Sequence, residues 1–228
     1  MIDLSNYQEI IHQGTVEWYR ARMGKFNASR ISELMGKGKK KDEYWSKAAL
    51  TYISEVAAER NVAKDVVEND DTFWAYLDLT TIENKYMRYG SEHEPEARDI
   101  YAEKHGVEVV EVGSIQHPDL PGFSCSPDGL VVSTNSGIEI KCPLPKTYWQ
   151  YFTEVHDAES LKAVKPEYYW QIMAQIAVCD LDYVDFVCYC EFMERPLHEV
   201  RVLRDDAAVA ELIERVNNAE KYIEEKWK

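Results

Sequence analysis

The hydrophobic pattern of the sequence changes its period near Gly106, and this change limits the fold more than any other feature. Before that residue, apolar side chains recur at the three- and four-residue spacing of a helix face. After it, they alternate with polar residues as in half-buried strands. Helices, then a small sheet, then further helices and strands predict a mixed α/β fold built in two or three layers.

Three helices are expected in the first part of the chain. Asn27 is a candidate N-cap for a helix that runs through Met35 and stops at Gly36. Asp42 opens a second segment whose apolar residues are spaced for one helical face. A third helix is predicted over residues 92–104, where Gly106 ends it.

The rest of the chain is predicted to mix short strands and helices. Strands are expected at residues 107–112, 123–125, 130–132, 138–140, 183–190 and 198–203. Helices are expected at residues 146–152 and 166–179 and from Asp205 to the end. We therefore expect a single domain over residues 1–228, with a mostly helical part (1–105) packed on an α/β core (106–228).

The charge balance excludes one class of function. Lys and Arg number 26 against 41 Asp and Glu, a formal charge of −15. Such a chain does not coat nucleic acid over its whole surface, whereas divalent cations take carboxylate oxygens as ligands. A local basic path stays open, because Lys37, Lys39, Lys40 and Lys41 form either a solvated turn or an arm that contacts phosphates.

Other patterns bear on compartment and metal class. No stretch approaches 18 consecutive apolar residues, and the first twenty residues lack the pattern of a secretory signal, so neither a membrane span nor secretion is expected. The five cysteines are odd in number and contain no C-x-x-C pair. Free thiols in a reducing cytoplasm are therefore expected, and zinc or iron–sulfur sites are not.

The residues best suited to chemistry lie around two strand candidates. Asp128 sits in a Ser-Pro-Asp-Gly turn, and Glu139 lies eleven residues later inside a strand. Because side chains alternate along a strand, Glu139 and Lys141 share one face, while Ile138 and Ile140 point into apolar packing. A hairpin joining the two strands would bring Asp128 beside Glu139.

Two carboxylates and an ammonium group on one small surface suit phosphoryl chemistry. The carboxylates can bind Mg²⁺, with the backbone carbonyl of Ile140 completing the shell. Lys141 can then orient a water or stabilise charge on a phosphoryl oxygen. The alternatives are an ordinary surface pair of Glu139 and Lys141, a plain hairpin turn, or a glycosidase with paired carboxylates.

This arrangement of Asp and Glu-x-Lys on adjacent strands resembles the core of the PD-(D/E)XK nucleases, the restriction-endonuclease-like fold. The longer strings CSPDGL and GIEIKCP resemble the phage lambda-type exonucleases, which are grouped with the YqaJ-like viral recombination nucleases. The resemblance covers nearly the whole chain. It implies a mixed central sheet flanked by helices and catalytic roles for Asp128, Glu139 and Lys141.

A flanking motif implies a site for the DNA end. The string WYRARMG at 18–24, followed by NAS at 27–29, is similar to the family element whose arginine and serine bind the 5′-terminal phosphate. The matching residues are Arg22 and Ser29, and Ser126 matches a third phosphate contact. Arginine has the fork geometry for a phosphate. Without the motif, Arg22 would be interpreted as one half of a surface ion pair.

Three further positions are assigned by resemblance. The string GSEHE at 90–94 is similar to the family's G-x-x-x-E helix start and implies that Glu94 joins the metal site; locally it belongs to an acidic first helical turn. PEYYWQ at 166–171 is similar to P-x-Y-x-x-Q and implies that Gln171 lies near the scissile phosphate, with Gln175 as the alternative. Met87 falls where the family places an apolar wedge between bases; a buried core methionine is the alternative.

The resemblance also implies an activity and its partners. It implies a Mg²⁺-dependent 5′→3′ exonuclease, with two ions per site and Mn²⁺ as an alternative metal. Such an enzyme degrades one strand of double-stranded DNA from a 5′-phosphorylated end to mononucleotides and leaves 3′ overhangs. A homotrimeric ring, a single-strand annealing partner and a phage or prophage origin in a bacterial cytoplasm are implied. The alternatives are a RecB-like or restriction-type nuclease with endonuclease or single-strand activity, or a non-catalytic DNA-end-binding protein.

Overall fold

The protein is described here by a computed structural model, which covers residues 12–38, 40, 42–81 and 85–226. Its strands form a three-stranded sheet of order β1-β3-β2 and a four-stranded sheet of order β4-β5-β6-β7. The strands are β1 (Phe26–Asn27), β2 (Ile115–Gln116), β3 (Phe123–Cys125), β4 (Gly129–Val131), β5 (Ser136–Lys141), β6 (Tyr183–Tyr189) and β7 (Leu197–Leu203). The α-helices are α1 (Val16–Arg22), α2 (Ile31–Met35), α3 (Lys47–Arg60), α4 (Lys64–Glu68), α5 (Asp70–Thr80), α6 (Lys85–His105), α7 (Pro145–Glu154), α8 (Ala158–Val164), α9 (Pro166–Cys179) and α10 (Asp206–Lys226). Two 3₁₀ helices, η2 (Ala28–Arg30) and η3 (Val132–Thr134), follow β1 and β4.

The four-stranded sheet is mixed and has β5 near its centre. Strand β5 pairs antiparallel with β4, where Gly129 lies opposite Ile138. On its other side β5 runs parallel to β6, and Glu139 lies opposite Phe186. Strand β7 completes the sheet antiparallel to β6. The mixed sheet flanked by helices agrees with the fold class expected from the sequence.

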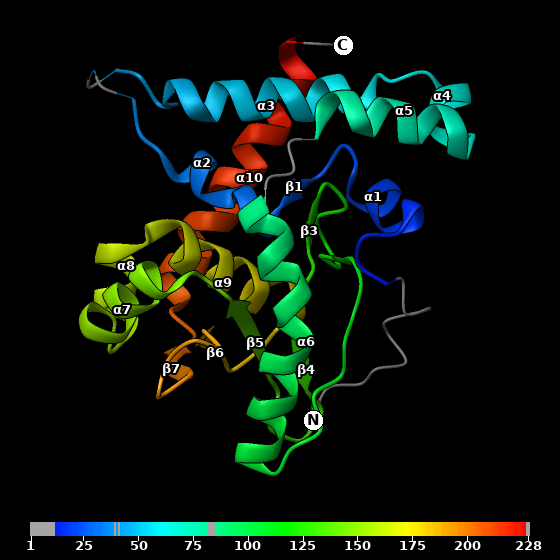
Figure 1. Cartoon of the computed structure of the whole chain (residues 1–228). Coiled ribbons are helices and arrows are strands. Elements are labelled where there is room, and N and C mark those ends of the chain that lie inside the picture. Colours follow the sequence, from blue (N-terminus) through cyan, green and yellow to red (C-terminus); the bar gives the residue numbers. More distant parts are fainter. Residues whose placement is uncertain (1–11, 39, 41, 82–84, 227–228) are drawn as a thin grey trace.

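Helices cover both faces of this sheet (Figure 1). Ile138 and Ile140 pack with Ala97 and Tyr101 of α6 in one apolar cluster. On the opposite face Phe186 belongs to a second cluster together with buried residues of α9. Alternate side chains of β5 therefore face different layers, which confirms the period-two pattern of the sequence.

The first part of the chain is tied to the second by shared core. Phe26 of β1 is fully buried and pairs in parallel register with Phe123 of β3. The same apolar cluster includes Ile53 of α3, buried residues of α9 and Leu212 of α10. The segment expected to be mostly helical thus also supplies a strand, which joins the sheet that carries β3.

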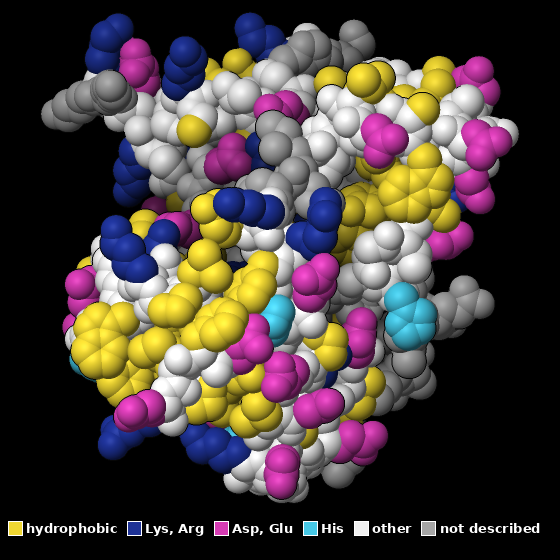
Figure 2. All heavy atoms as spheres, in the orientation of Figure 1, with side chains coloured by type: hydrophobic (Ala, Val, Ile, Leu, Met, Phe, Trp, Pro, Cys, Tyr) yellow, Lys and Arg dark blue, Asp and Glu magenta, His cyan; other side chains and the backbone are white. Residues whose placement is uncertain are grey.

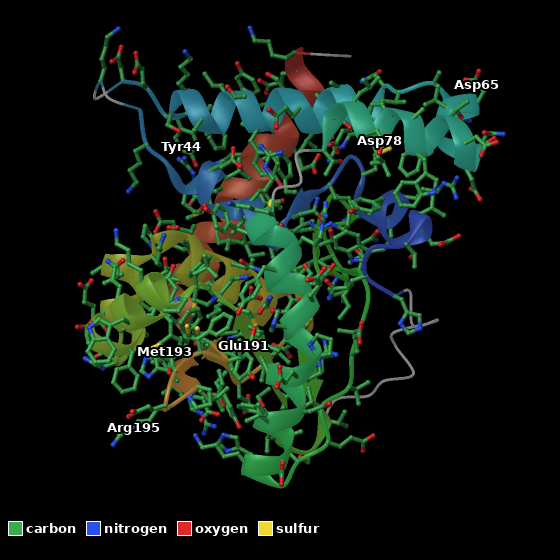
Figure 3. All side chains as sticks on the ribbon, in the orientation of Figure 1. Tyr44, Asp65, Asp78, Glu191, Met193 and Arg195 are labelled. Carbon is green, nitrogen blue, oxygen red and sulfur yellow. The ribbon has the colours of Figure 1, made fainter. Side chains whose placement is uncertain are left out.

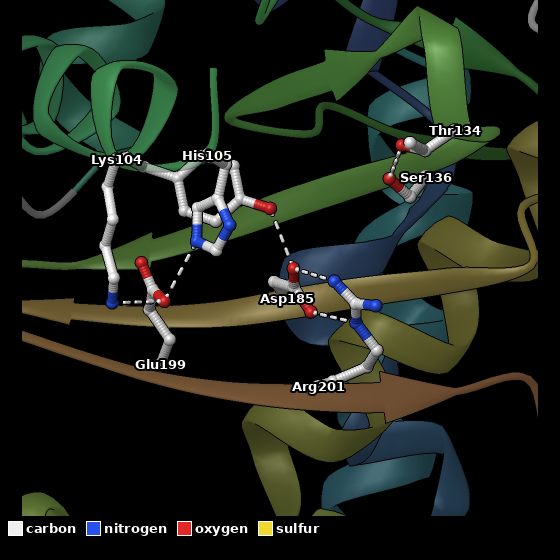
Figure 4. Close-up of polar contacts among 8 residues, drawn as sticks. Lys104, His105, Thr134, Ser136, Asp185, Glu199 and Arg201 are labelled. Carbon is white, nitrogen blue, oxygen red and sulfur yellow. Dashed lines mark hydrogen bonds and ion pairs between the residues drawn. The ribbon is translucent and has the colours of Figure 1, made fainter. Parts of the chain in front are cut away.

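A polar network fixes the C-terminal half of α6 on the sheet (Figure 4). The Tyr101 hydroxyl donates to Oδ2 of Asp185 at 2.7 Å, and Arg201 donates to both carboxylate oxygens of Asp185 at 2.9 and 3.0 Å. Lys104 and His105 both contact Oε2 of Glu199, at 2.8 and 3.0 Å. These contacts join α6 to β6 and β7, so they fix the helix that also carries Glu94.

A buried arginine anchors the segment between α2 and α3. Arg215 of α10 is 4% exposed, and its guanidinium donates to the backbone oxygen of Leu34 at 2.7 Å through Nε. It also donates to the backbone oxygen of Tyr44 at 3.2 Å and lies over the Trp45 ring at 4.5 Å. Tyr44 marks the place where the chain enters α3 in Figure 3. Both ends of the lysine-bearing segment are therefore held by one side chain.

Several local predictions were wrong. Residues 107–112 do not form a strand; only Val110 makes a bridge, to Leu130. Asn27 does not cap a helix, because its amide donates to the backbone oxygens of Arg22 and Lys25, and a 3₁₀ turn precedes α2. The valines of 107–112 pack on the core without a partner strand over most of that length.

Two helix starts and four whole helices also differ from expectation. Helix α3 begins at Lys47 rather than Asp42, because the Ser46 side chain accepts the N–H of Ala49 at 3.1 Å. Helix α6 is already formed at Lys85, so Glu94 lies in its interior and not in an acidic first turn. Pro95 also lies inside this helix. Helices α1, α4, α5 and α8 were not individually predicted.

One apolar area is conspicuous on the face shown in Figure 2. Hydrophobic side chains gather at the lower left of Figure 2, over α7 and the connection of β6 to β7. Exposed members there are Leu144, Trp149 and Phe192, and Figure 3 places Glu191, Met193 and Arg195 in the same connection. No helix in the described part of the chain is both long and apolar enough to span a bilayer.

Candidate active site

Asp128 is held by backbone and side-chain contacts at the start of β4. The register that pairs Gly129 with Ile138 places the preceding Asp128 opposite Glu139. Its Oδ2 accepts the backbone N–H of Ile140 at 2.6 Å, and Nε of Arg98 donates to its carbonyl oxygen at 2.8 Å. The carboxylate is therefore turned toward β5, as the hairpin argument predicts.

Glu139 and Lys141 lie on one face of β5, as the alternation of the strand predicts. The Lys141 ammonium donates to Oε1 of Glu139. It also lies 5.1 Å from the ring centroid of Tyr168 on α9. Glu139 is fully buried and Lys141 is about a quarter exposed (26%), so the pair is not an ordinary surface ion pair.

The glutamine that contacts this pair is Gln175. Its Nε2 donates to Oε2 of Glu139. Gln171, which the motif had indicated, lies one helical turn earlier on α9 and is also buried. The sequence had left Gln175 as the alternative, and in this structure the contact belongs to that residue.

Three carboxylates, those of Asp128, Glu94 and Glu139, lie near enough for the charge of one to affect the pKa of another. Burial raises the pKa of the Asp128 carboxyl well above its usual range, and the charges of Glu139 and Glu94 raise it further. Burial also raises the pKa of Glu94, which Lys141 opposes in part. Burial by itself would lower the Lys141 pKa, but Glu139 and Asp128 outweigh it and raise that pKa. One ammonium group thus faces three acids that repel one another.

This group of side chains fits a divalent cation in donor type and charge. Carboxylate oxygens are the ligands that Mg²⁺ and Mn²⁺ prefer, and a cation would relieve the repulsion among Asp128, Glu94 and Glu139. Within the described ranges, no three acidic, histidine or cysteine side chains converge as a ready-made metal site. In this structure the two carboxylate oxygens of Glu139 accept hydrogen bonds, Oε1 from Lys141 and Oε2 from Gln175.

A second group of polar side chains converges next to the acids. Nη1 of Arg22 donates to Oγ of Ser126 at 3.1 Å, and Nη2 donates to Oγ of Ser29 at 3.0 Å. Nε1 of Trp18 donates to the same Ser126 hydroxyl at 3.0 Å, and the Arg22 guanidinium lies 4.3 Å from the centroid of the Trp18 ring. The three residues assigned to the 5′ phosphate are therefore brought together.

The charge of Arg22 has no carboxylate partner in the described part of the chain, so the surface ion pair was the wrong alternative. Burial lowers the pKa of Arg22, although nearby acidic and phenolic groups oppose the shift. A desolvated guanidinium beside two hydroxyls is suited to a phosphate. After the role that the sequence predicts for them, we call the group of Arg22, Ser29 and Ser126 the phosphate pocket.

Local structure explains why the two groups adjoin. Ser126 directly follows β3, and Asp128 comes two residues later at the start of β4. Ser29 lies in η2, directly after β1, and the pairing of β1 with β3 sets it beside Ser126. A single turn thus connects the phosphate pocket to the acidic group.

The remaining predicted DNA contacts lie elsewhere. Lys37 and Lys40 are exposed and pair with Glu211 at 3.6 Å and Glu43 at 3.2 Å. Figure 1 shows their segment projecting at the far left, on the side opposite α1, so the structure does not bring them to Arg22. Lys39 and Lys41 lie outside the described residues. Met87 is 53% exposed on α6, which contradicts the alternative of a buried core methionine.

Sequence reasoning gave no role to three residues that contact the site: Trp18, Arg98 and Tyr168. Trp18 and Tyr168 stood within the quoted motifs, and Arg98 within the same acidic helix as Glu94. Arg98 also pairs with Glu111 at 2.9 Å, which fixes its other end. No local sequence signal indicates that Arg98 holds the Asp128 turn, because the contact depends on how α6 docks.

Comparisons with solved structures identify the fold. The chain is 33% identical to an alkaline exonuclease from Laribacter hongkongensis, with a TM-score of 0.71 and coverage of 93% of this chain and 94% of that one. That enzyme has also been crystallised in complex with dAMP. A phage-related exonuclease from Haemophilus somnus 129PT has the same fold at 18% identity and a TM-score of 0.66, over 88% of this chain and 94% of that one. The fold is of the PD-(D/E)XK type.

Sequence comparisons identify the family. An uncharacterized protein (R354) of Acanthamoeba polyphaga mimivirus is 29% identical over 121 residues, or 48% of this chain. The match covers 21% of the viral protein, so the chain spans about a fifth of the length of that relative. The family model for the YqaJ-like viral recombinase domain matches residues 17–182. The chain therefore belongs to the YqaJ-like viral recombinase family.

Proposed function

We propose that the protein is a metal-dependent 5′→3′ exonuclease that degrades one strand of double-stranded DNA from a 5′-phosphorylated end. One observation supports this proposal more strongly than any other. The Asp128, Glu139 and Lys141 group lies one turn from a phosphate pocket, in which Arg22 contacts both serine hydroxyls. A nuclease that cuts inside a strand has no need of a terminal-phosphate site, whereas an end-specific nuclease does. The exonuclease names of the solved relatives support the same activity.

The acidic group would hold Mg²⁺ or Mn²⁺. Asp128, Glu139 and Glu94, with the backbone carbonyl of Ile140, are the oxygen donors, and we propose two ions per site. A bound cation supplies Lewis-acid polarisation of the phosphate and lowers the pKa of a water. Lys141 donates a hydrogen bond toward charge that develops on a phosphoryl oxygen, in a position fixed before the reaction begins.

The phosphate pocket would set the direction of digestion. Arg22 offers two parallel N–H donors, and Ser29 and Ser126 add hydroxyl donors. Cleavage of the first phosphodiester bond leaves a new 5′ phosphate on the remaining strand, which can enter the same pocket. Mononucleotide release and a 3′ overhang follow from repeated steps of this kind. Gln171 and Met87 remain proposed contacts with the scissile region and the terminal base pair.

Assembly and partners are part of the same proposal. A homotrimeric ring that encloses the DNA would turn Lys37 and Lys40, with Lys39 and Lys41, toward the duplex and keep the acidic surface outside. The 3′ overhang is the substrate of a single-strand annealing protein, which we propose as the functional partner. A phage or prophage origin, with action in the bacterial cytoplasm, agrees with the viral recombinase family.

A substrate comparison tests the proposal. In Mg²⁺, a linear duplex with 5′ phosphates should be degraded to mononucleotides, while a matched duplex with 5′ hydroxyls is degraded more slowly and closed circular DNA stays intact. A radiolabel at the 5′ end should appear in the first mononucleotides released, and a 3′ label only late. Cleavage of the closed circle at the same rate as the linear duplex would contradict the proposal and indicate an endonuclease.

A further inference from the structure

Gln175 is a polar side chain in an apolar part of the core. It lies on α9 between Ala174 and Ile176, and none of the three side chains is exposed to solvent. The helix packs against β3 and β6, so this position faces the layer between helix and sheets. A leucine or methionine would fill such a position without carrying polar atoms into the core.

The amide of Gln175 contacts the carboxylate at the centre of the acidic group. Nε2 of Gln175 donates to Oε2 of Glu139, while the Lys141 ammonium donates to Oε1. A carboxylate can only accept hydrogen bonds, so the amide nitrogen must face Glu139. Both oxygens of the carboxylate are thus held, one from β5 itself and one from α9.

The carbonyl oxygen of the same amide shows that core packing alone does not explain why residue 175 is a glutamine. Oε1 of Gln175 is buried and has no hydrogen-bond partner among the described residues. An unpartnered buried carbonyl costs folding free energy. This cost is avoided by any apolar residue of the same length, so the hydrogen bond to Glu139 must be the reason for the amide.

We propose that Gln175 is a positioning residue that fixes the orientation of the Glu139 carboxylate for metal binding. The inference rests on the proposed function, because it takes Glu139 as a metal ligand. Without the amide, Lys141 is the one hydrogen-bond partner that the described residues leave to the Glu139 carboxylate, which can then rotate about its side-chain bonds. The effect reaches Lys141 as well, since the ammonium lies between Glu139 and the ring of Tyr168.

Gln175→Met tests this role because methionine matches the length of glutamine and removes both polar atoms. We expect the affinity for Mn²⁺, measured by calorimetry on the full chain without DNA, to fall about tenfold, as for other residues that orient a metal ligand. With DNA present, kcat should fall by a similar factor while KM for the DNA end stays unchanged. Met173→Leu on the same helix is the matched control and should leave both quantities unaltered.

The outcomes separate positioning from packing. If Gln175→Met folds with the thermal midpoint of the unsubstituted chain and keeps its Mn²⁺ affinity, the proposal is overturned. Gln175→Leu serves the same comparison if the methionine variant does not fold. Mn²⁺ binding without cleavage by the unsubstituted protein would reject the exonuclease and still decide the role of Gln175. If the unsubstituted protein does not bind Mn²⁺ at all, both the exonuclease proposal and the positioning role of Gln175 are overturned.

Discussion

At the scale of single residues, Arg22 shows how one side chain connects sequence, geometry and substrate choice. It is desolvated, it stacks on Trp18, and it donates to two serine hydroxyls that follow different strands. In the described part of the chain its guanidinium is not neutralised by a carboxylate. A charge held in this way is preorganised for an anion that comes from outside the protein.

Replacing Arg22 by Lys should weaken recognition of the 5′ phosphate and leave the chemistry intact. Lysine keeps the charge and loses the two-pronged donor geometry, a loss of about 1.5 kcal/mol or roughly tenfold in rate. The ratio of degradation rates for 5′-phosphorylated and 5′-hydroxyl duplexes should therefore fall about tenfold. The control is Arg20→Lys. Arg20 lies on the same helix as Arg22 but pairs with Asp70 of α5, so this change should leave the ratio unaltered. An unchanged ratio in the Arg22 variant would remove that residue from the phosphate pocket.

The active-site residues differ in how far the sequence alone could place them. Asp128 and Glu139 could be paired because a hairpin fixes its own register, and Lys141 followed from the alternation of one strand. Gln171 was preferred over Gln175 on the motif, and the sequence could not show that Gln175, one turn later, contacts Glu139, because that contact depends on how α9 docks. Arg98 could not be found, since it contacts the Asp128 turn from α6, thirty residues away.

At the scale of elements, the sheet and its covering helices explain why some predictions succeeded and others did not. The residue limits of α9 were predicted correctly, because Pro166 starts it and its apolar run ends at Cys179. Residues 107–112 alternate like a strand, but β4 offers a partner to only one of them. Alternation reports burial on one side, and it cannot report whether a neighbouring strand is present.

The network that attaches α6 to the sheet should contribute measurably to stability. Asp185 is 4% exposed and accepts hydrogen bonds from both Arg201 and Tyr101, so Asp185→Ala would remove the carboxylate partner of a buried hydroxyl and of a guanidinium. We expect the free energy of unfolding in urea to fall by about 3 kcal/mol. Tyr101→Phe should cost about 1 kcal/mol, and the surface change Lys104→Ala less than about 0.5 kcal/mol. Equal, small effects from all three would show that the network does not support α6.

His198 should make the stability of this region depend on pH. Burial lowers its pKa below the ordinary value of 6.5, with the nearby His156 acting in the same direction and the carbonyl of Val155 and Glu199 opposing it. The unfolded chain then binds the proton more readily than the folded one. The stabilisation is complete above about pH 6.5 and is lost as the pH falls through the lower folded value.

Urea unfolding at several pH values checks this sign. The loss of stability between pH 7.5 and pH 5 should be smaller for His198→Gln than for the unsubstituted protein, because glutamine does not titrate. His12→Gln, a change in an exposed histidine, should keep the original pH dependence. A larger loss in the His198 variant would mean that the pKa is raised rather than lowered in the folded state.

At the scale of the whole molecule, the charge of −15 has to be reconciled with the proposed DNA substrate. Basic groups are gathered at particular places, such as the phosphate pocket and the segment of Lys37 and Lys40, while acidic side chains are spread over the face seen in Figure 2. A closed ring would direct the basic groups inward, toward the duplex. The acidic side chains on its outside would repel other nucleic acid. Light scattering on the full chain should accordingly find particles of three chains; a monomer at micromolar concentration would contradict the ring.

The central claim is that the turn aspartate and the Glu–Lys pair of β5 cleave phosphodiester bonds. Lys141→Ala tests it most directly when single-turnover cleavage and binding of a 5′-phosphorylated duplex are measured together in Mg²⁺, with Lys64→Ala as the surface control. We predict at least about a hundredfold loss of cleavage in the Lys141 variant, with DNA binding changed by no more than about threefold. Undiminished cleavage by that variant would contradict the account.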